Sequence, residues 1–186
     1  MSDLQQGERV GDETSSPAFT IYRGKDAALY LGSRRRGAAE ENAHPAIQRG
    51  LKMMYETGAS GGASVRVLFD SPELHLSYVW FKSGFPLPLH SHDVDCLYQI
   101  IAGSMRVGTE ELGKGDGMFI PSGVPYTVTP GPDGVEFLEI RTRDDYDTHY
   151  RAKTDAYWDK IAATRTERAP IWTQEHAPYG LLDEQQ

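Results

Sequence analysis

Residues 84–103 read GFPLPLHSHDVDCLYQIIAG, and this stretch decides the expected fold. His90 and His92 are separated by one residue, so on a β-strand both side chains point to the same face. Neutral imidazole is a common ligand of Zn, Fe, Ni and Cu. Pro86 and Pro88 restrict the residues before them to extended backbone. The stretch therefore predicts a strand that directs two imidazoles toward one point.

The sequence around this stretch has the pattern of β-structure. From residue 64 onward, short runs rich in β-branched and aromatic residues alternate with turn residues. The runs are SVRVLF, ELHLSYVWFK, DCLYQIIAGSMRV, GMFIP, YTVT and VEFLEIRT. Several short strands at close spacing favour a sandwich or a barrel. No Gly-rich phosphate loop joins a strand to a helix, which argues against a dinucleotide-binding fold.

The pattern changes after Arg143, and the chain divides into three segments. Tyr157, Trp158 and Ile161 would form one apolar edge, which predicts a helix from about 154 to 165. Residues 1–18 are polar without periodicity, and we expect them to be disordered. We expect a β-barrel with an N-terminal strand extension over 19–143, and a C-terminal helix and tail over 144–186.

Composition and charge exclude several classes of function. The net charge is −8, which argues against binding to nucleic acid, and the one basic run, 34–36, fits a solvated loop. No apolar stretch approaches the roughly 20 residues needed to span a bilayer, so we expect no membrane partner. The polar N-terminus has no apolar signal region, and the single cysteine fits a reducing compartment. We therefore expect a cytoplasmic protein.

Two glycine- and proline-containing motifs follow each other at a defined spacing. The first comprises Gly84, His90-Ser-His92, position 96 and Gly103, and the second comprises Gly115, Pro121-Ser-Gly123 and position 126. In order and spacing, they resemble the two motifs of the cupin superfamily. The resemblance implies an all-β fold, a double-stranded β-helix or jelly-roll barrel of the RmlC-like type. We expect it to carry a short C-terminal helix and an extended N-terminal segment.

The resemblance also implies a metal site, although two ligand positions differ. The family usually has Glu at the position of Cys96 and a third His at the position of Tyr126. The implied ion is a divalent Fe, Mn, Ni or Zn held by His90 and His92, with Cys96 or Tyr126 as a further ligand. The implied function is a small-molecule metalloenzyme of the dioxygenase, isomerase or lyase class. Cys96 and Tyr126 would then be its catalytic residues.

Other interpretations of the same residues stay open. Without a metal, the barrel would bind a small organic ligand in a pocket that includes both histidines, without catalysis. A Cys96–Tyr126 thioether, as in some thiol-oxidising cupins, is a second alternative. Cys96 paired with a histidine as a nucleophile is a third. For contacts with the substrate or ligand, we expect Tyr98, Tyr78, Trp80 and Phe119.

Further residues could join the site or an interface. His75 and Gln99 are additional candidates, and Glu136 and Glu139, three residues apart on the last strand, should face opposite sides. Oligomers of identical chains are most often two-fold symmetric, so we expect a homodimer. Trp158 and Trp172, which lie outside the barrel, could be buried against the second subunit.

Overall fold

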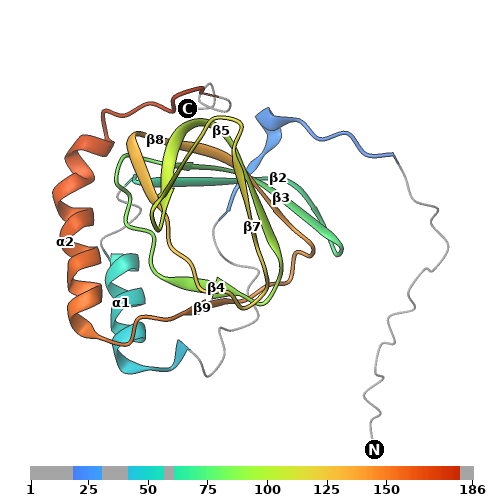
Figure 1. Cartoon of the computed structure of the whole chain (residues 1–186). Helices are drawn as coiled ribbons and strands as arrows, with labels where there is room; N and C mark the ends of the chain where they lie inside the picture. Colours follow the sequence, from blue (N-terminus) through green and yellow to red (C-terminus); the bar gives the residue numbers. More distant parts are fainter. Residues whose placement is uncertain (1–18, 31–41, 57–60, 181–186) are drawn as a thin grey trace, which may run out of the picture.

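The computed structural model describes residues 19–30, 42–56 and 61–180 (Figure 1). Residues 1–18 and the basic run 34–36 lie outside the described residues. The elements, in chain order, are η1 (Gly24–Asp26), β1 (Ala28–Leu29), α1 (Pro45–Glu56), β2 (Ala63–Ser71), β3 (Leu74–Phe81), β4 (His90–His92), β5 (Cys96–Val107), β6 (Glu110–Gly113), β7 (Gly117–Ile120), β8 (Thr129–Arg141), β9 (Thr148–Tyr150) and α2 (Asp155–Trp172).

The strands form two antiparallel sheets that together make a barrel. The larger sheet has the order β1-β2-β3-β8-β5-β6, with β7 also paired to β5, and β4 pairs with β9 in the smaller sheet. An isolated bridge between His90 and Tyr126 adds a further backbone pairing to β4. Figure 1 shows the strands curled around a common interior, with α1 and α2 side by side on one flank. The predicted all-β jelly-roll fold with a C-terminal helix is confirmed.

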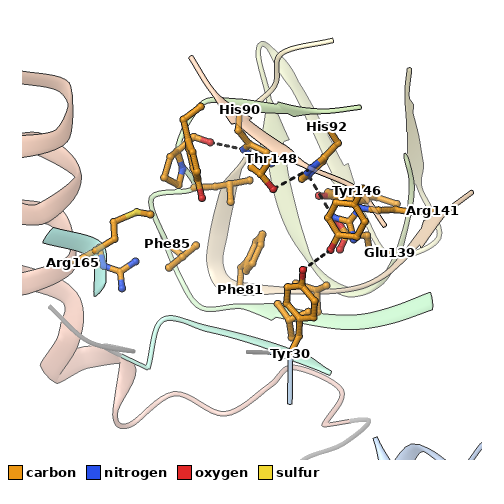
Figure 2. A pocket seen from close by; sticks show the side chains of 17 residues that line it. Tyr30, Phe81, Phe85, His90, His92, Glu139, Arg141, Tyr146, Thr148 and Arg165 are labelled. Atoms are coloured by element: carbon orange, nitrogen blue, oxygen red, sulfur yellow. Dashed lines mark hydrogen bonds and ion pairs between the residues drawn. The ribbon is translucent and has the colours of Figure 1, made fainter. Parts of the chain in front are cut away.

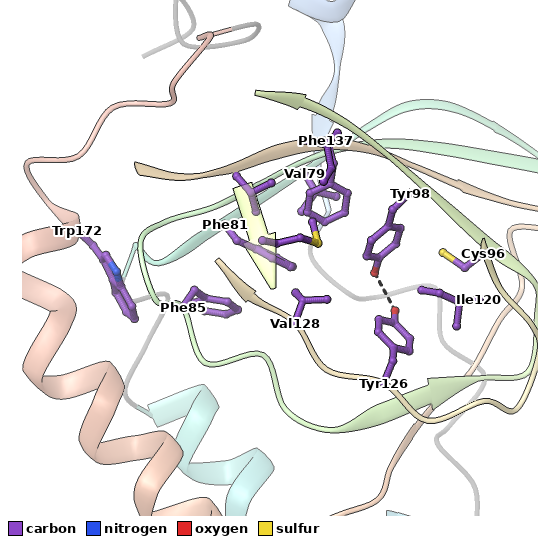
Figure 3. Packing of buried hydrophobic residues seen from close by; sticks show 13 residues of the cluster. Val79, Phe81, Phe85, Cys96, Tyr98, Ile120, Tyr126, Val128, Phe137 and Trp172 are labelled. Carbon is purple, nitrogen blue, oxygen red and sulfur yellow. Dashed lines mark hydrogen bonds between the residues drawn. The ribbon is translucent and has the colours of Figure 1, made fainter. Parts of the chain in front are cut away.

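The barrel interior is filled by alternate residues of its central strands. Val79, Phe81, Tyr98, Ile100 and Phe137 are buried there (Figure 3). In the register, Val79 lies opposite Phe137, and Phe81 lies opposite Val135. Since successive strand residues point to opposite faces, odd-numbered residues of β3 and β8 face inward. This parity determines which polar side chains reach the interior.

The glycine that ends the first motif is required by the packing of two strands. Gly103 has φ +70°, and a Cβ atom there would lie 2.2 Å from the carbonyl oxygen of Gly134. The β5–β8 register shifts between Gly103 and Met105. Only glycine allows both this backbone conformation and so close an approach. The motif glycine therefore marks where the barrel bends.

The helices differ from the prediction in extent and in what they cover. Helix α1 was not predicted, and α2 continues to Trp172 instead of ending near residue 165. A Cβ atom on Gly50 of α1 would lie 2.0 Å from the Trp158 ring, so the two helices touch. Trp158 and Trp172 are both 0% exposed within the single chain. The expectation that they bury against a second subunit is therefore wrong, while the homodimer stays a prediction.

One of the predicted strands does not form as a separate strand. Of the YTVT run, Tyr126 pairs through an isolated bridge to His90, and Thr129 pairs with Arg106 as the first residue of β8. The strands also continue further along the chain than predicted, because β9 lies after residue 143, the expected end of the barrel. Among the described residues, no helix has both the length and the apolarity of a membrane span.

Candidate functional site

A cavity of about 220 Å³ opens inside the barrel, next to β4 (Figure 2). One part of its wall is apolar and includes Val65, Val79, Phe81, Phe85 and Leu87. Another part is polar and includes His90, His92, Glu139, Arg141, Tyr146 and Thr148. Figure 2 shows Arg141 and Glu139 on one side of the cavity and Arg165 of α2 on the other. The cavity thus combines an apolar body with charged side chains on two opposite sides.

The two motif histidines converge, as their spacing predicts. The ring centroids of His90 and His92 are 4.9 Å apart, and both side chains are buried. His90 Nδ1 lies 2.6 Å from the carbonyl oxygen of Pro88, and His92 Nδ1 lies 3.1 Å from that of Asp147. Because a carbonyl oxygen only accepts, each Nδ1 carries a hydrogen. Nε2 is then the nitrogen of each ring that is suited to accept from a ligand or a metal.

A buried asparagine positions the strand that flanks these histidines. Asn42 is 0% exposed, and its side chain donates to the Thr148 carbonyl at 2.7 Å and accepts from the Tyr150 N–H at 2.9 Å. In the β4–β9 register, Tyr150 lies opposite His90, and Thr148 lies opposite His92. The Thr148 hydroxyl also lies 3.4 Å from His92 Nδ1. Asn42 therefore holds β9 where it orients the histidine rings.

A buried ion pair stands beside His92. Glu139 and Arg141 follow the inward parity of β8, and Arg141 Nη2 donates to Glu139 Oε1 at 2.5 Å. The same Nη2 lies 3.5 Å from His92 Nε2, and the guanidinium carbon lies 4.0 Å from the centre of the Tyr146 ring. Burial alone would lower the pKa of Arg141, but the Glu139 carboxylate raises it above its ordinary range. The cavity therefore holds a permanent cation.

The thiol and the phenol that replace the usual ligands are both neutral. Cys96 is 1% exposed, and its sulfur lies 3.7 Å from Glu139 Oε1. Burial, and then the charge of Glu139, raise the pKa of the Cys96 thiol. The same two causes raise the pKa of Tyr126, whose hydroxyl lies 2.8 Å from that of Tyr98. Each group therefore keeps its proton at neutral pH.

The residues present do not fit a divalent metal ion. Among the described residues, no group of three His, Cys, Asp or Glu side chains is arranged to hold one. Glu139, the carboxylate among the residues that line the cavity, is bound by Arg141, which also contacts His92 Nε2. A metal would have to displace the guanidinium from both groups. Leaving that guanidinium buried without its counter-charge costs about 3–5 kcal/mol.

The expected ligand-contact residues are divided by strand parity. Tyr98 lines the cavity. Tyr78 and Trp80 lie on the opposite face of β3, where the Tyr78 hydroxyl donates to Glu136 at 2.6 Å. Phe119 is 61% exposed. The structure therefore places Tyr78, Trp80 and Phe119 outside this cavity, because the parity of each strand directs them away from it.

The other candidates are divided in the same way. Glu139 lines the cavity and Glu136 does not, which confirms that the two face opposite sides. His75 has the inward parity of β3 and is buried but does not line the cavity; its Nδ1 lies 2.9 Å from Asp70 and its Nε2 lies 2.7 Å from Ser77. The Gln99 side chain is exposed and donates to the carbonyl oxygens of Gly115 and Asp116.

Sequence reasoning missed most of the polar end of the cavity. Arg141 lies two residues after Glu139, so strand parity could have placed it inside once Phe137 was taken as a core residue. Tyr146 and Thr148 carry no such signal, since Tyr146 lies in an irregular segment and Thr148 begins a strand of only three residues. Arg165 reaches the cavity from a helix that lies outside the barrel.

Comparison with known proteins gives structural likeness only. No protein-family model matches the chain, and no curated protein matches it. An RmlC-like cupin from Shewanella frigidimarina NCIMB 400 matches 45% of this chain and 78% of its own at 23% identity, with a TM-score of 0.41. The polyketide cyclase RemF from Streptomyces resistomycificus matches 56% of this chain and 83% of its own at 22% identity and a TM-score of 0.45.

A larger share of this chain matches an oxalate decarboxylase variant from B. subtilis. The match covers 66% of this chain but 40% of that one, at 23% identity and a TM-score of 0.45. These similarities are partial and remote, so the fold rests on the strand order, the register and the two motifs of this chain. By these features, the chain has the β-barrel fold of the cupin superfamily.

Proposed function

We propose that this barrel binds a small organic molecule in its cavity without a metal ion. The observation that carries the proposal is the Arg141 guanidinium, which lies between Glu139 and His92 where a metal ligand set would have to form. Phe81 and Phe85, whose rings stack with centroids 5.1 Å apart, give an occupant an apolar surface. Burying such surface against a ligand is the general source of affinity in small-molecule pockets.

The size of the cavity limits the ligand. A volume of about 220 Å³ corresponds to roughly seven water molecules at about 30 Å³ each. It is smaller than the roughly 300–1,000 Å³ typical of pockets for drug-sized ligands. The occupant is therefore a compact molecule, about the size of one substituted six-membered ring.

Thermal unfolding in the presence of chelator tests this proposal. The full chain, dialysed against EDTA, is heated with and without benzyl alcohol, a neutral probe of suitable size. At ten times the dissociation constant, we expect a stabilisation of about 1.4 kcal/mol, or about 3–6 °C in Tm. Val65→Phe, which narrows the cavity, should reduce the shift. Val124→Phe, at an exposed position outside the cavity, should leave it unchanged.

The same experiment decides between this proposal and a metal-dependent function. A shift that is absent in EDTA and returns on addition of Zn²⁺ or Mn²⁺ would contradict metal-free binding. It would support instead an ion held by His90 and His92. A shift of equal size in the presence and absence of EDTA supports the proposal.

A further inference from the structure

The polar end of the cavity contains a buried guanidinium that is only partly satisfied. Arg141 has a side-chain exposure of 5%, and its Nη2 serves both Glu139 and His92. Its other two nitrogens, Nε and Nη1, are buried without a hydrogen-bond partner among the described residues. Buried N–H groups of this kind are costly unless an acceptor reaches them. Arg141 lines the cavity, so an occupant of the cavity is the acceptor available to it.

We infer that the ligand is a monoanionic organic acid, whose carboxylate accepts a hydrogen bond from Nη1 of Arg141, the terminal nitrogen that has no partner among the described residues. This inference rests on the proposed function and names the class of ligand. A hydrogen bond from a guanidinium to a carboxylate is charge-assisted and about twice as strong as a neutral one. The hydroxyls of Tyr98 and Tyr126 already pair with each other, and that of Tyr146 pairs with Tyr30 at 3.1 Å.

The neighbours of Arg141 limit the charge and the shape of this acid. Tyr146 stacks on the guanidinium, which leaves the edges of the guanidinium for hydrogen bonds. The Glu139 carboxylate lies 2.5 Å from Nη2, so a dianion such as phosphate would meet a like charge at close range. The rest of the acid faces Val79, Phe81 and Phe85, which are apolar. These contacts select a single carboxylate on an apolar body.

Calorimetric titration with two probes of equal size tests the inference. Benzoate and benzamide differ in charge but hardly in shape, and both are titrated into the full chain in EDTA at neutral pH. We expect benzoate to bind at least about tenfold more tightly than benzamide. In Arg141→Lys, which keeps a cation beside Glu139 but loses the Nη1 donor, the preference should fall below about threefold. The matched control Arg143→Lys, at an exposed ion pair outside the cavity, should keep the tenfold preference.

The outcomes separate this inference from the proposed function. Equal binding of benzoate and benzamide by the wild type would overturn the inference and leave metal-free binding intact. A preference that survives Arg141→Lys but is lost in Arg165→Lys would also overturn it. If neither benzoate nor benzamide bound, both the inference and the proposed function would be overturned. Unchanged affinity for benzamide shows that the Lys variant keeps its cavity. If Arg141→Lys no longer binds benzamide, the double variant Glu139→Gln/Arg141→Gln is used in its place. If this double variant still bound benzoate more tightly than benzamide, the inference would be contradicted.

Discussion

Replacing Arg141 by methionine is expected to lower the free energy of unfolding by about 3–5 kcal/mol. The substitution leaves the Glu139 carboxylate, which is 7% exposed, inside the barrel without its counter-charge. Urea unfolding, followed by tryptophan fluorescence, measures the loss. The double variant Glu139→Gln/Arg141→Met removes both charges, so its stability should return to within about 2 kcal/mol of wild type.

A matched control lies two residues further along the chain. Arg143 donates to Asp93 at 2.5 Å, but these side chains are 39% and 38% exposed. Exposed pairs contribute about 0–1 kcal/mol, so Arg143→Met should have a small effect. Equal losses for Arg141→Met and Arg143→Met would contradict the buried charge pair on which the site depends.

Replacing Trp172 by alanine is expected to cost about 3–5 kcal/mol of stability. The Trp172 side chain is fully buried, its ring lies 5.9 Å from that of Phe85, and its Nε1–H donates to the Ser83 carbonyl at 2.9 Å. It attaches the end of α2 to the barrel. Its neighbour Ile171 is 50% exposed, so Ile171→Ala should have a much smaller effect.

The concentration dependence of this loss tests where the tryptophan is buried. If Trp172 packs within its own chain, the loss in Trp172→Ala should be the same at low and high protein concentration. If it were buried against a second subunit, the stability of the wild type would depend on protein concentration and that of the variant would not. The second result would restore the expectation that the sequence suggested and contradict the packing described above.

The barrel and the histidine pair could be predicted from the sequence because both depend on local pattern. His90 and His92 share a face through their spacing alone, and the glycines mark turns and close approaches such as that at Gly103. The opposite orientation of Glu136 and Glu139 follows from the same period of two. These features need no knowledge of which strands pair.

The remaining features depended on strand register, which a single sequence does not determine. Tyr78 and Trp80 are as aromatic as the core residues on the same strand, yet a shift of one residue exchanges the two faces. Arg141 looked like a charged strand end, because its ion pair and its contact with His92 exist only after β8 pairs with β3 and β5. Helix α1 was missed although Ile47, Leu51 and Met54 recur at helical spacing, because Gly50 weakens a helix and is explained only by its packing against Trp158.

Anomalous X-ray diffraction tests the central claim most directly. Crystals of the full chain are grown with benzoate and with equal concentrations of ZnCl₂ and MnCl₂, and data are collected above and below both absorption edges. We predict a carboxylate on Nη1 of Arg141, with Nη2 still on Glu139 and no anomalous peak between His90 and His92. A peak bonded to Nε2 of both histidines, with Arg141 turned away from Glu139, would contradict the account.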